Sequence, residues 1–185
     1  QPDHAKLAIE CIKAINERMK ELHAQWQAEG LEPFTIRGGL QSGEVVAGNV
    51  GLEGKKMEYT IIGDTVNQAA RLEGTAKYYG VAYLVGEDTY QRTREVFRYR
   101  ELDKIRVLGK QLPVTIYEPL EGLSKLDDGL AKRFEAALVL YRGREWVGAK
   151  SGFGEILAAL PEDKPSKIYE ERCEYFMHNP PAAEW

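Results

Sequence analysis

The stretch EYTIIGDTVNQAARLE, residues 58–73, decides the fold around it. Its first part alternates as a β-strand does, Gly63-Asp64 is typical of a turn, and helix-favouring residues follow. Asn67 and Arg71 are four residues apart in the predicted helix, a spacing that places both side chains on one face. The stretch therefore predicts a strand, a turn and a helix that presents a polar pair just past the turn.

The rest of residues 1–122 predicts a mixed α and β domain. Apolar residues recur at spacings of three and four over residues 3–29, which predicts a long amphipathic helix with Asp3 as its N-cap and Gly30 as its stop. The helix after Gly63 should end at Gly80, and glycines 38, 39, 43, 48 and 51 predict bends in a twisted hairpin. Strands are predicted at residues 34–38, 44–47 and 55–62, within residues 81–90 before a short helix, and within residues 96–108 and 112–120.

Residues 123–185 have a different character, because apolar residues there recur at helical spacing. Phe134, Leu138 and Tyr141, followed by Trp146 and Phe153, predict two antiparallel helices. The order of large and small residues resembles one tetratricopeptide unit, and a single unit cannot bury its own apolar face. We therefore expect a helical hairpin extension that packs on the α/β half or on a partner.

Composition and charge exclude several classes of protein. The chain has 185 residues, 43% of them hydrophobic, and a net charge of −4 without a long basic run, so nucleic acid is not an expected partner. It has no apolar stretch of roughly 20 residues and no export signal at its start, so we expect no membrane contact from this segment. Cys11 and Cys173 lie far apart in the sequence and have no second Cys or His at metal-binding spacing, so neither a disulfide framework nor a zinc site is expected. Two unpaired thiols favour a reducing cytoplasm.

Three blocks together carry a family resemblance: IRGGLQSGEVVAGNVG (residues 36–51), EYTIIGDTVNQAARLE (residues 58–73) and VLGKQLPVTIYE (residues 107–118). Their order and spacing resemble the C-terminal part of a class III adenylyl/guanylyl cyclase catalytic domain of the bacterial type. The competing phosphate-loop signature is not met, since Gly54-Lys55 is followed by Lys56 and Asn49 stands where the first glycine is required. The resemblance implies an α+β fold, a partial ferredoxin-like domain with an antiparallel-rich sheet and helices.

The resemblance also implies a reaction, the conversion of ATP to cyclic AMP and pyrophosphate by two-metal in-line attack of the ribose 3′-hydroxyl. Asn67 and Arg71 match the family's catalytic pair, in which the amide orients the ribose and the guanidinium meets the phosphate oxygens. Lys110 matches the lysine that binds the terminal phosphates, although by itself it is an ordinary turn lysine. Thr60 falls at the base-reading position, which favours ATP over GTP, although Thr is also a common strand residue.

The family's Mg²⁺ or Mn²⁺ ions are held by two aspartates in motifs upstream of the long first helix, and neither motif occurs in this sequence. We therefore expect no metal ligand in this chain, a longer parent protein, and an isolated chain that is inactive. Family active sites form between two catalytic domains, which implies a homodimer through the cyclase domain. The tail also resembles extensions of bacterial membrane-anchored receptor cyclases, which implies a parent anchored in a membrane with this part in the cytoplasm.

Two other readings remain open. One is a catalytically inactive cyclase-like module for dimerisation or nucleotide sensing in signalling, in which Asn67 and Arg71 merely persist. The other is a helical scaffold built on residues 123–185, which the sequence supports with a single helical unit. The two upstream aspartates distinguish the enzyme from the inactive module.

Overall fold

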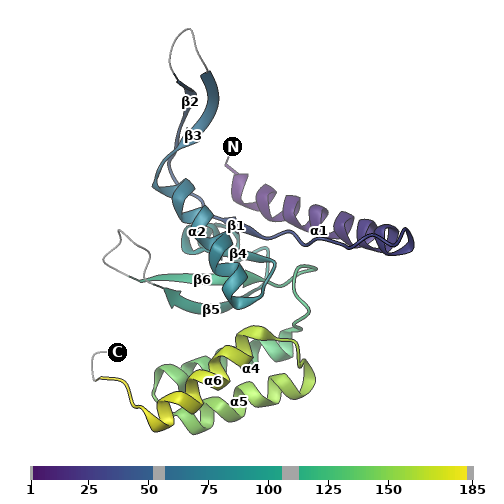
Figure 1. Ribbon diagram of the computed structural model, residues 1–185. Coiled ribbons are helices and arrows are strands. Elements are labelled where there is room, and N and C mark those ends of the chain that lie inside the picture. The colour runs from purple at the N-terminus through teal and green to yellow at the C-terminus, as the bar shows by residue number, and fades with distance from the viewer. Residues whose placement is uncertain (1, 52–56, 106–112, 183–185) are drawn as a thin grey trace.

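The computed structural model describes residues 2–51, 57–105 and 113–182 (Figure 1). The elements in this part of the chain confirm the predicted α+β class. In chain order they are α1 (His4–Ala28), β1 (Gly38–Leu40), β2 (Val46–Gly51), β3 (Met57–Ile62), α2 (Asp64–Tyr79), β4 (Tyr83–Gly86), α3 (Glu87–Thr93), β5 (Tyr99–Ile105), β6 (Val114–Pro119), α4 (Asp128–Arg142), α5 (Trp146–Ala159) and α6 (Lys164–His178).

The described strands form a four-stranded sheet and a separate two-stranded hairpin. The sheet has the order β1-β4-β6-β5, in which β1 runs parallel to β4 and the other neighbours are antiparallel. The hairpin consists of β2 and β3 and stands away from the sheet (Figure 1). The sheet is therefore rich in antiparallel pairs, as the family resemblance implied.

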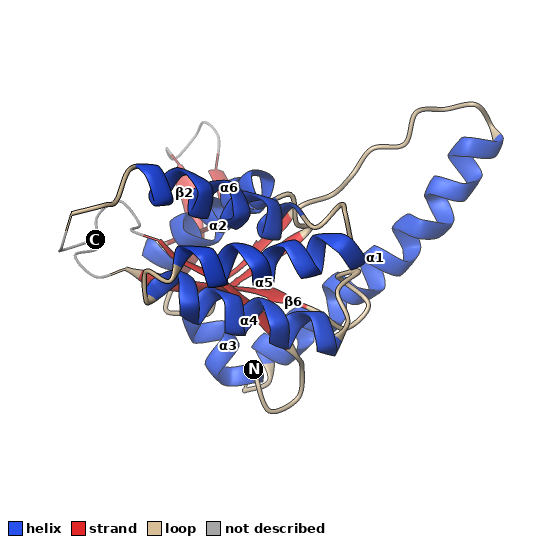
Figure 2. Ribbon diagram, turned by 90° about the horizontal axis from the view of Figure 1, so that it is seen from below, coloured by secondary structure: helices blue, strands red, loops and turns tan. Residues whose placement is uncertain are grey.

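Alternate residues of the central strands face two different cores. Leu84 of β4 and Ile116 of β6 belong to a large core that includes α2 and the helices after residue 127. The next residue of each strand, Val85 and Tyr117, belongs to a smaller core with Ile9 of α1. Helices therefore cover both faces of the sheet, and Figure 2 shows α4, α5 and α6 layered over the strands.

Two predicted strand boundaries are displaced in the structure. The strand expected at residues 34–38 begins only at Gly38, and the strand expected at residues 44–47 begins at Val46. A strand exists where a partner backbone is present, and β1 pairs with β4 in the register that joins Gly38 to Tyr83. The helix ends were predicted more closely, because Gly30 and Gly80 both adopt the left-handed conformation that glycine permits, at φ 73° and 69°.

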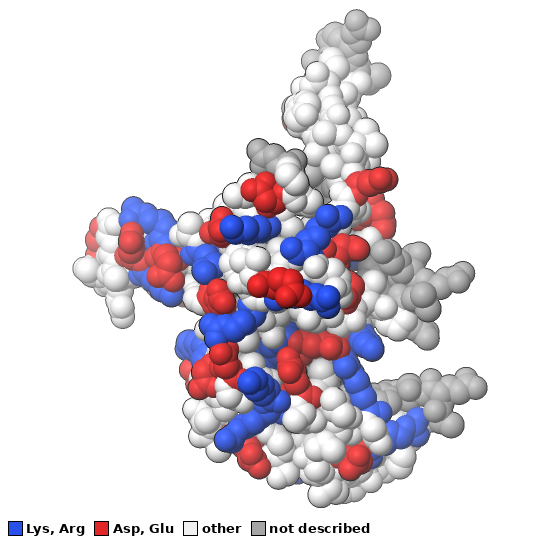
Figure 3. All heavy atoms as spheres, turned by 180° about the vertical axis from the view of Figure 1, so that it is seen from behind, with Lys and Arg blue, Asp and Glu red and all other residues white. Residues whose placement is uncertain are grey.

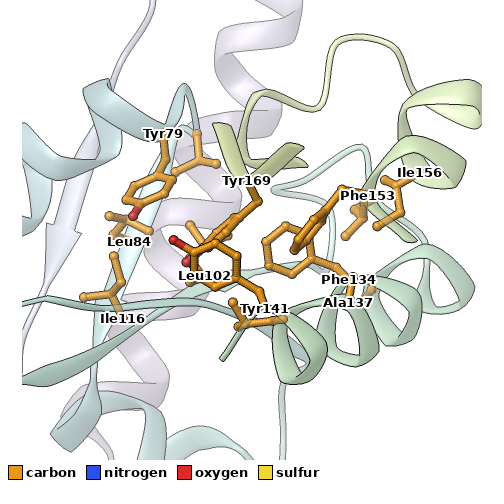
Figure 4. Close-up of a cluster of buried hydrophobic side chains, with 14 of the residues drawn as sticks. Tyr79, Leu84, Leu102, Ile116, Phe134, Ala137, Tyr141, Phe153, Ile156 and Tyr169 are labelled. Atoms are coloured by element: carbon orange, nitrogen blue, oxygen red, sulfur yellow. The ribbon is translucent and has the colours of Figure 1, made fainter. Parts of the chain in front are cut away.

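The helical extension continues the core of the sheet. The two predicted helices are α4 and α5, and a third helix, α6, follows them. Phe134, Phe153 and Tyr169 of the extension pack in the same cluster as Leu102 and Ile116 of the sheet (Figure 4). The helical extension was expected to pack on the α/β half or on a partner, and the structure shows that it packs on the α/β half.

A buried ion triad joins the sheet to the start of α6. The guanidinium of Arg100 in β5 donates from Nε to Glu118 Oε2 at 2.9 Å and from Nη1 to both carboxylate oxygens of Asp163, at 3.0 and 2.9 Å. Burial alone lowers the pKa of Arg100, but the two carboxylates outweigh it and hold that pKa above its ordinary value. Asp163 also caps α6 by accepting from the Ser166 backbone N–H, at 3.1 Å.

Candidate active site

The predicted strand, turn and helix are β3, Gly63 and α2, and side-chain contacts fix where the helix begins. The Thr65 hydroxyl donates to the backbone carbonyl of Glu44 at 3.0 Å. Gly43 lies against the same hydroxyl, because a Cβ added at residue 43 would come within 2.4 Å of Thr65 Oγ1. The loop before β2 therefore holds the first turn of α2 in place.

The middle of α2 rests directly on the backbone of β1. A Cβ added at Gly39 would lie 2.1 Å from the carbonyl oxygen of Ala69 and 2.6 Å from the backbone nitrogen of Glu73. Leu72 and Ala76, on the same side of the helix, are buried at 5% and 0% exposure. Glycine at residue 39 lets helix and strand approach closely, so the middle of α2 packs directly on β1.

Asn67 and Arg71 are both exposed, one helical turn apart on α2, as predicted. Arg71 also borders a hollow between α2, the sheet and the start of α3, called the Arg71 hollow below. Its lining residues are Gln41, Gln68, Arg71, Leu72, Gly86, Glu87, Asp88, Ile105, Val114 and Ile116. An exposed guanidinium at the edge of such a hollow can contact an anionic ligand from solvent.

The polar wall of the Arg71 hollow was not foreseen from the sequence. Gln41 Nε2 donates to Asp88 Oδ2 at 2.7 Å in this wall. Glu87 Oε2 accepts a hydrogen bond at 2.9 Å from the hydroxyl of Tyr117, a residue of the smaller core that does not itself line the hollow. Burial, together with the Glu87 carboxylate, raises the pKa of Tyr117, so this phenol stays a proton donor. In the sequence, Glu87 and Asp88 are ordinary acidic residues in the first turn of a short helix, and no local signal connects them to Arg71.

The other two predicted substrate-binding residues have different outcomes. Thr60 is exposed on β3, opposite Gly48 of β2, on the projecting hairpin, and it is not among the residues that line the Arg71 hollow. Lys110 lies outside the described residues, so its predicted role stays a prediction. The structure thus brings Asn67 and Arg71 together on one helix and leaves Thr60 apart from them.

Within the part of the chain that the structure describes, no group of three or more His, Cys, Asp or Glu side chains is arranged to hold a metal ion. The described residues therefore do not fit the two-metal centre that the family resemblance implies. No helix within residues 2–51, 57–105 and 113–182 combines the length and apolar character that a membrane span requires.

Comparison with known proteins identifies the family of this chain. The model of the "Adenylate and Guanylate cyclase catalytic domain" family matches residues 2–118. Adenylate cyclase 1 of Rhizobium meliloti is 35% identical over 115 residues, which are 62% of this chain and 17% of that protein. The terminal-differentiation specific adenylate cyclase of Dictyostelium discoideum is 32% identical over 176 residues, 90% of this chain and 8% of that protein. The chain thus spans a small part of either relative.

Solved structures agree with this assignment. The adenylyl cyclase CyaB from P. aeruginosa has a TM-score of 0.58 and 32% identity, with 68% of this chain and 63% of that chain covered. The guanylyl cyclase Cya2 has a TM-score of 0.57 and 26% identity, with 69% and 63% covered. The tetratricopeptide-like character of the extension is not supported by these comparisons and stays a prediction. The fold, the segment that carries Asn67 and Arg71, and these matches all support one assignment. The chain belongs to the adenylate and guanylate cyclase catalytic domain family.

Proposed function

We propose that residues 1–122 are the C-terminal part of a nucleotidyl cyclase catalytic domain that converts ATP to cyclic AMP and pyrophosphate, and that residues 123–185 are a helical extension of it. The observation that carries the proposal is the exposed pair of Asn67 and Arg71, one turn apart in the first half of α2, within the segment that the family model covers. The names of two relatives, from Rhizobium meliloti and Dictyostelium discoideum, favour the adenylate cyclase reaction.

The roles of this pair follow from their chemistry. Attack of the ribose 3′-hydroxyl on the α-phosphate builds negative charge on the phosphate oxygens and on the leaving pyrophosphate. The Arg71 guanidinium is always charged and presents its donors in a fork, so it stabilises that charge. The Asn67 amide both donates and accepts hydrogen bonds, so it can hold the ribose in the orientation needed for in-line attack.

Two further residues complete the proposed substrate contacts. Lys110 binds the terminal phosphates as a point charge. Thr60 contacts the base through its hydroxyl, which is both a donor and an acceptor. Because a hydroxyl can satisfy either purine, Thr60 supports ATP over GTP less strongly than Asn67 and Arg71 support the cyclase reaction itself.

Mg²⁺ or Mn²⁺ is implied by the family resemblance and would stabilise the attacking and leaving oxygens. The described residues provide no cluster for it, so no step above depends on a ligand from this chain. Because neither of the family's two metal-binding aspartate motifs occurs in this sequence, we propose that residues 1–185 alone are inactive.

We also propose that the active form is a homodimer and that the hairpin of β2 and β3 contributes to its interface. Val46 and Tyr59 are each 75% exposed, and Ile61 and Ile62 are 51% and 54% exposed. Figure 3 shows few charged side chains on the visible face of this hairpin, in contrast to the mixed charges over the body. Val46 and Ile62 share one face of the hairpin and Tyr59 and Ile61 share the other, and exposed apolar side chains gathered on one projecting hairpin are typical of a protein contact.

The test uses the full-length gene product that contains these residues. The purified protein is incubated with Mn²⁺ and either ATP or GTP, and both cyclic nucleotides are quantified by mass spectrometry. Arg71→Ala is compared with Arg18→Ala, which removes an exposed helical arginine paired with Glu21 on α1. We expect cyclic AMP from the parent, a loss of at least about a hundredfold in Arg71→Ala, and little change in Arg18→Ala.

Each other result has a definite meaning. Cyclic GMP as the main product would retain the cyclase reaction and contradict the assignment of ATP. No product from either nucleotide, with folded dimeric protein confirmed, would favour the alternative, an inactive cyclase-like module for dimerisation or nucleotide sensing in signalling.

A further inference from the structure

The last turn of α2 is held by a polar contact that lies far from Asn67 and Arg71. Tyr79, the final residue of α2, is 1% exposed, and its hydroxyl donates to Asp103 Oδ2 of β5 at 2.5 Å. Burial, followed by the adjacent Asp103 carboxylate, raises the pKa of Tyr79. The phenol therefore stays protonated, and the hydrogen bond to Asp103 persists over the range in which enzymes are assayed.

A residue of the helical extension shares the same carboxylate. Arg172 of α6 donates from Nη1 to Asp103 Oδ2 at 3.0 Å, and its Nη2 donates to the Tyr78 hydroxyl at 3.4 Å. The side chains of Arg172 and Asp103 are 29% and 18% exposed, so this ion pair is shielded more than a surface pair. One guanidinium thus connects the extension, strand β5 and the end of α2.

Two neighbouring contacts keep Arg172 in this position. Tyr169, one turn earlier on α6, is fully buried, and its hydroxyl donates to the backbone carbonyl of Leu102 at 2.8 Å. The Arg172 guanidinium lies over the Tyr169 ring, 5.0 Å from its centroid. The first turn of α6 also touches the end of α2, because a Cβ added at Gly80 would come within 2.6 Å of Lys164 Cδ.

The geometry of a helix connects this contact to the catalytic pair. Tyr79 and Arg71 are eight residues apart on one uninterrupted helix, a distance of about 12 Å at about 1.5 Å per residue. Because α2 is one continuous hydrogen-bonded helix, a rotation or shift of its last turn is passed to the preceding turns and changes the direction in which Asn67 and Arg71 point. A misplacement of about 1 Å can cost about a hundredfold in rate.

We propose that Arg172, through Asp103 and Tyr79, is a positioning residue for the cyclase reaction, so that the helical extension sets the orientation of the helix that carries Asn67 and Arg71. This inference rests on the proposed function. The alignment with the Dictyostelium discoideum adenylate cyclase covers 90% of the chain and so extends over most of the extension, which fits a shared role for the two parts.

The kinetic test uses the full-length gene product and compares Arg172→Ala, Arg172→Lys and Tyr79→Phe. The control is Lys150→Ala, which removes the ion pair between Lys150 of α5 and Glu174 of α6 and leaves the contacts to α2 intact. We expect Arg172→Ala and Tyr79→Phe to lower kcat by at least about tenfold and to change the KM for the nucleotide by less than about threefold. Arg172→Lys keeps the positive charge but loses the forked pair of guanidinium donors, so it should recover part of kcat. Lys150→Ala should have the kcat and KM of the unsubstituted protein.

A double-mutant cycle separates positioning from simple loss of stability. If Arg172 acts through Arg71, then Arg172→Ala should lower kcat much less in the Arg71→Ala background than in the parent. Multiplicative effects of the two substitutions would overturn the proposal. A loss of kcat in Lys150→Ala as large as the loss in Arg172→Ala would also overturn it.

A second measurement does not depend on activity. Hydrogen exchange of the full-length protein should be faster at the amides of residues 76–79 in Arg172→Ala, with the amides of α4 unchanged. Unchanged exchange in α2 would overturn the proposal even if the parent is an active cyclase. An inactive parent with faster exchange in α2 would instead refute the proposed function, and with it the catalytic role of Arg172, while retaining the contact itself.

Discussion

Arg100→Met would leave two carboxylates in the interior without their counter-charge. Arg100 is 1% exposed, and its partners Glu118 and Asp163 are 5% and 7% exposed. The Met side chain is close in length to the aliphatic stem of Arg, so it replaces the packing of the stem. It does not replace the guanidinium that lies over the Phe134 ring, 4.6 Å from the ring centroid. The substitution therefore removes the charge and its hydrogen bonds while retaining most of the packing.

The magnitude follows from the burial of the whole triad. Removing one partner of a buried ion pair costs about 3–5 kcal/mol, because the remaining charge is desolvated and unpaired. Two carboxylates are left here, so we expect a loss of free energy of unfolding of about 4 kcal/mol or more. For a chain of this size each kcal/mol lowers the unfolding temperature by about 2–4 °C, so Tm should fall by about 8–16 °C.

Urea unfolding of residues 1–185 at pH 7, followed by circular dichroism and tryptophan fluorescence, measures this loss. Arg98→Met is the matched control, because Arg98 has two acidic partners, Glu121 and Asp128, but is 56% exposed. The control should leave the free energy of unfolding nearly unchanged, since exposed ion pairs are well screened by water. A loss in Arg100→Met no larger than that of the control would refute the reasoning, and separate transitions for the two probes would contradict a core shared by sheet and extension.

The remaining predictions concern the contact of Gly39 with α2, the hairpin of β2 and β3, and the two thiols. Gly39→Ala forces a methyl group into the α2 backbone and should destabilise the protein by about 1–3 kcal/mol in urea unfolding, whereas Gly48→Ala, with open space around it, should cost much less. Tyr59→Ser should weaken the proposed dimer, and sedimentation that shows an unchanged dimer would remove the hairpin from the interface. Burial raises the pKa of Cys173 to about 11, so iodoacetamide at pH 8 should label exposed Cys11 and spare Cys173, whereas urea should expose both to labelling. Because of the same shift, the folded protein holds the Cys173 thiol proton more tightly than the unfolded chain, so the free energy of unfolding should fall as pH rises above about 9. Urea unfolding at a series of pH values checks this direction.

The sequence alone determined the features that depend on neighbours along the chain. Left-handed glycines end α1 and α2 where predicted, and the alternation of residues 57–62 predicted β3. The spacing of Asn67 and Arg71 placed both on one helical face because the helical repeat is a local property. The family resemblance supplied the proposed roles of Thr60 and Lys110, which no local pattern could have indicated.

The tertiary structure alone decided what depends on residues far apart in the sequence. It placed Gly39 beneath α2, where the sequence suggested only a bend, and it moved the start of β1 to the position of its partner strand. Arg100 and Asp163 are 63 residues apart, and Asp103 and Arg172 are 69 apart. In the sequence each of these charges resembles an ordinary surface residue, because burial and pairing arise only when distant segments pack and exclude water.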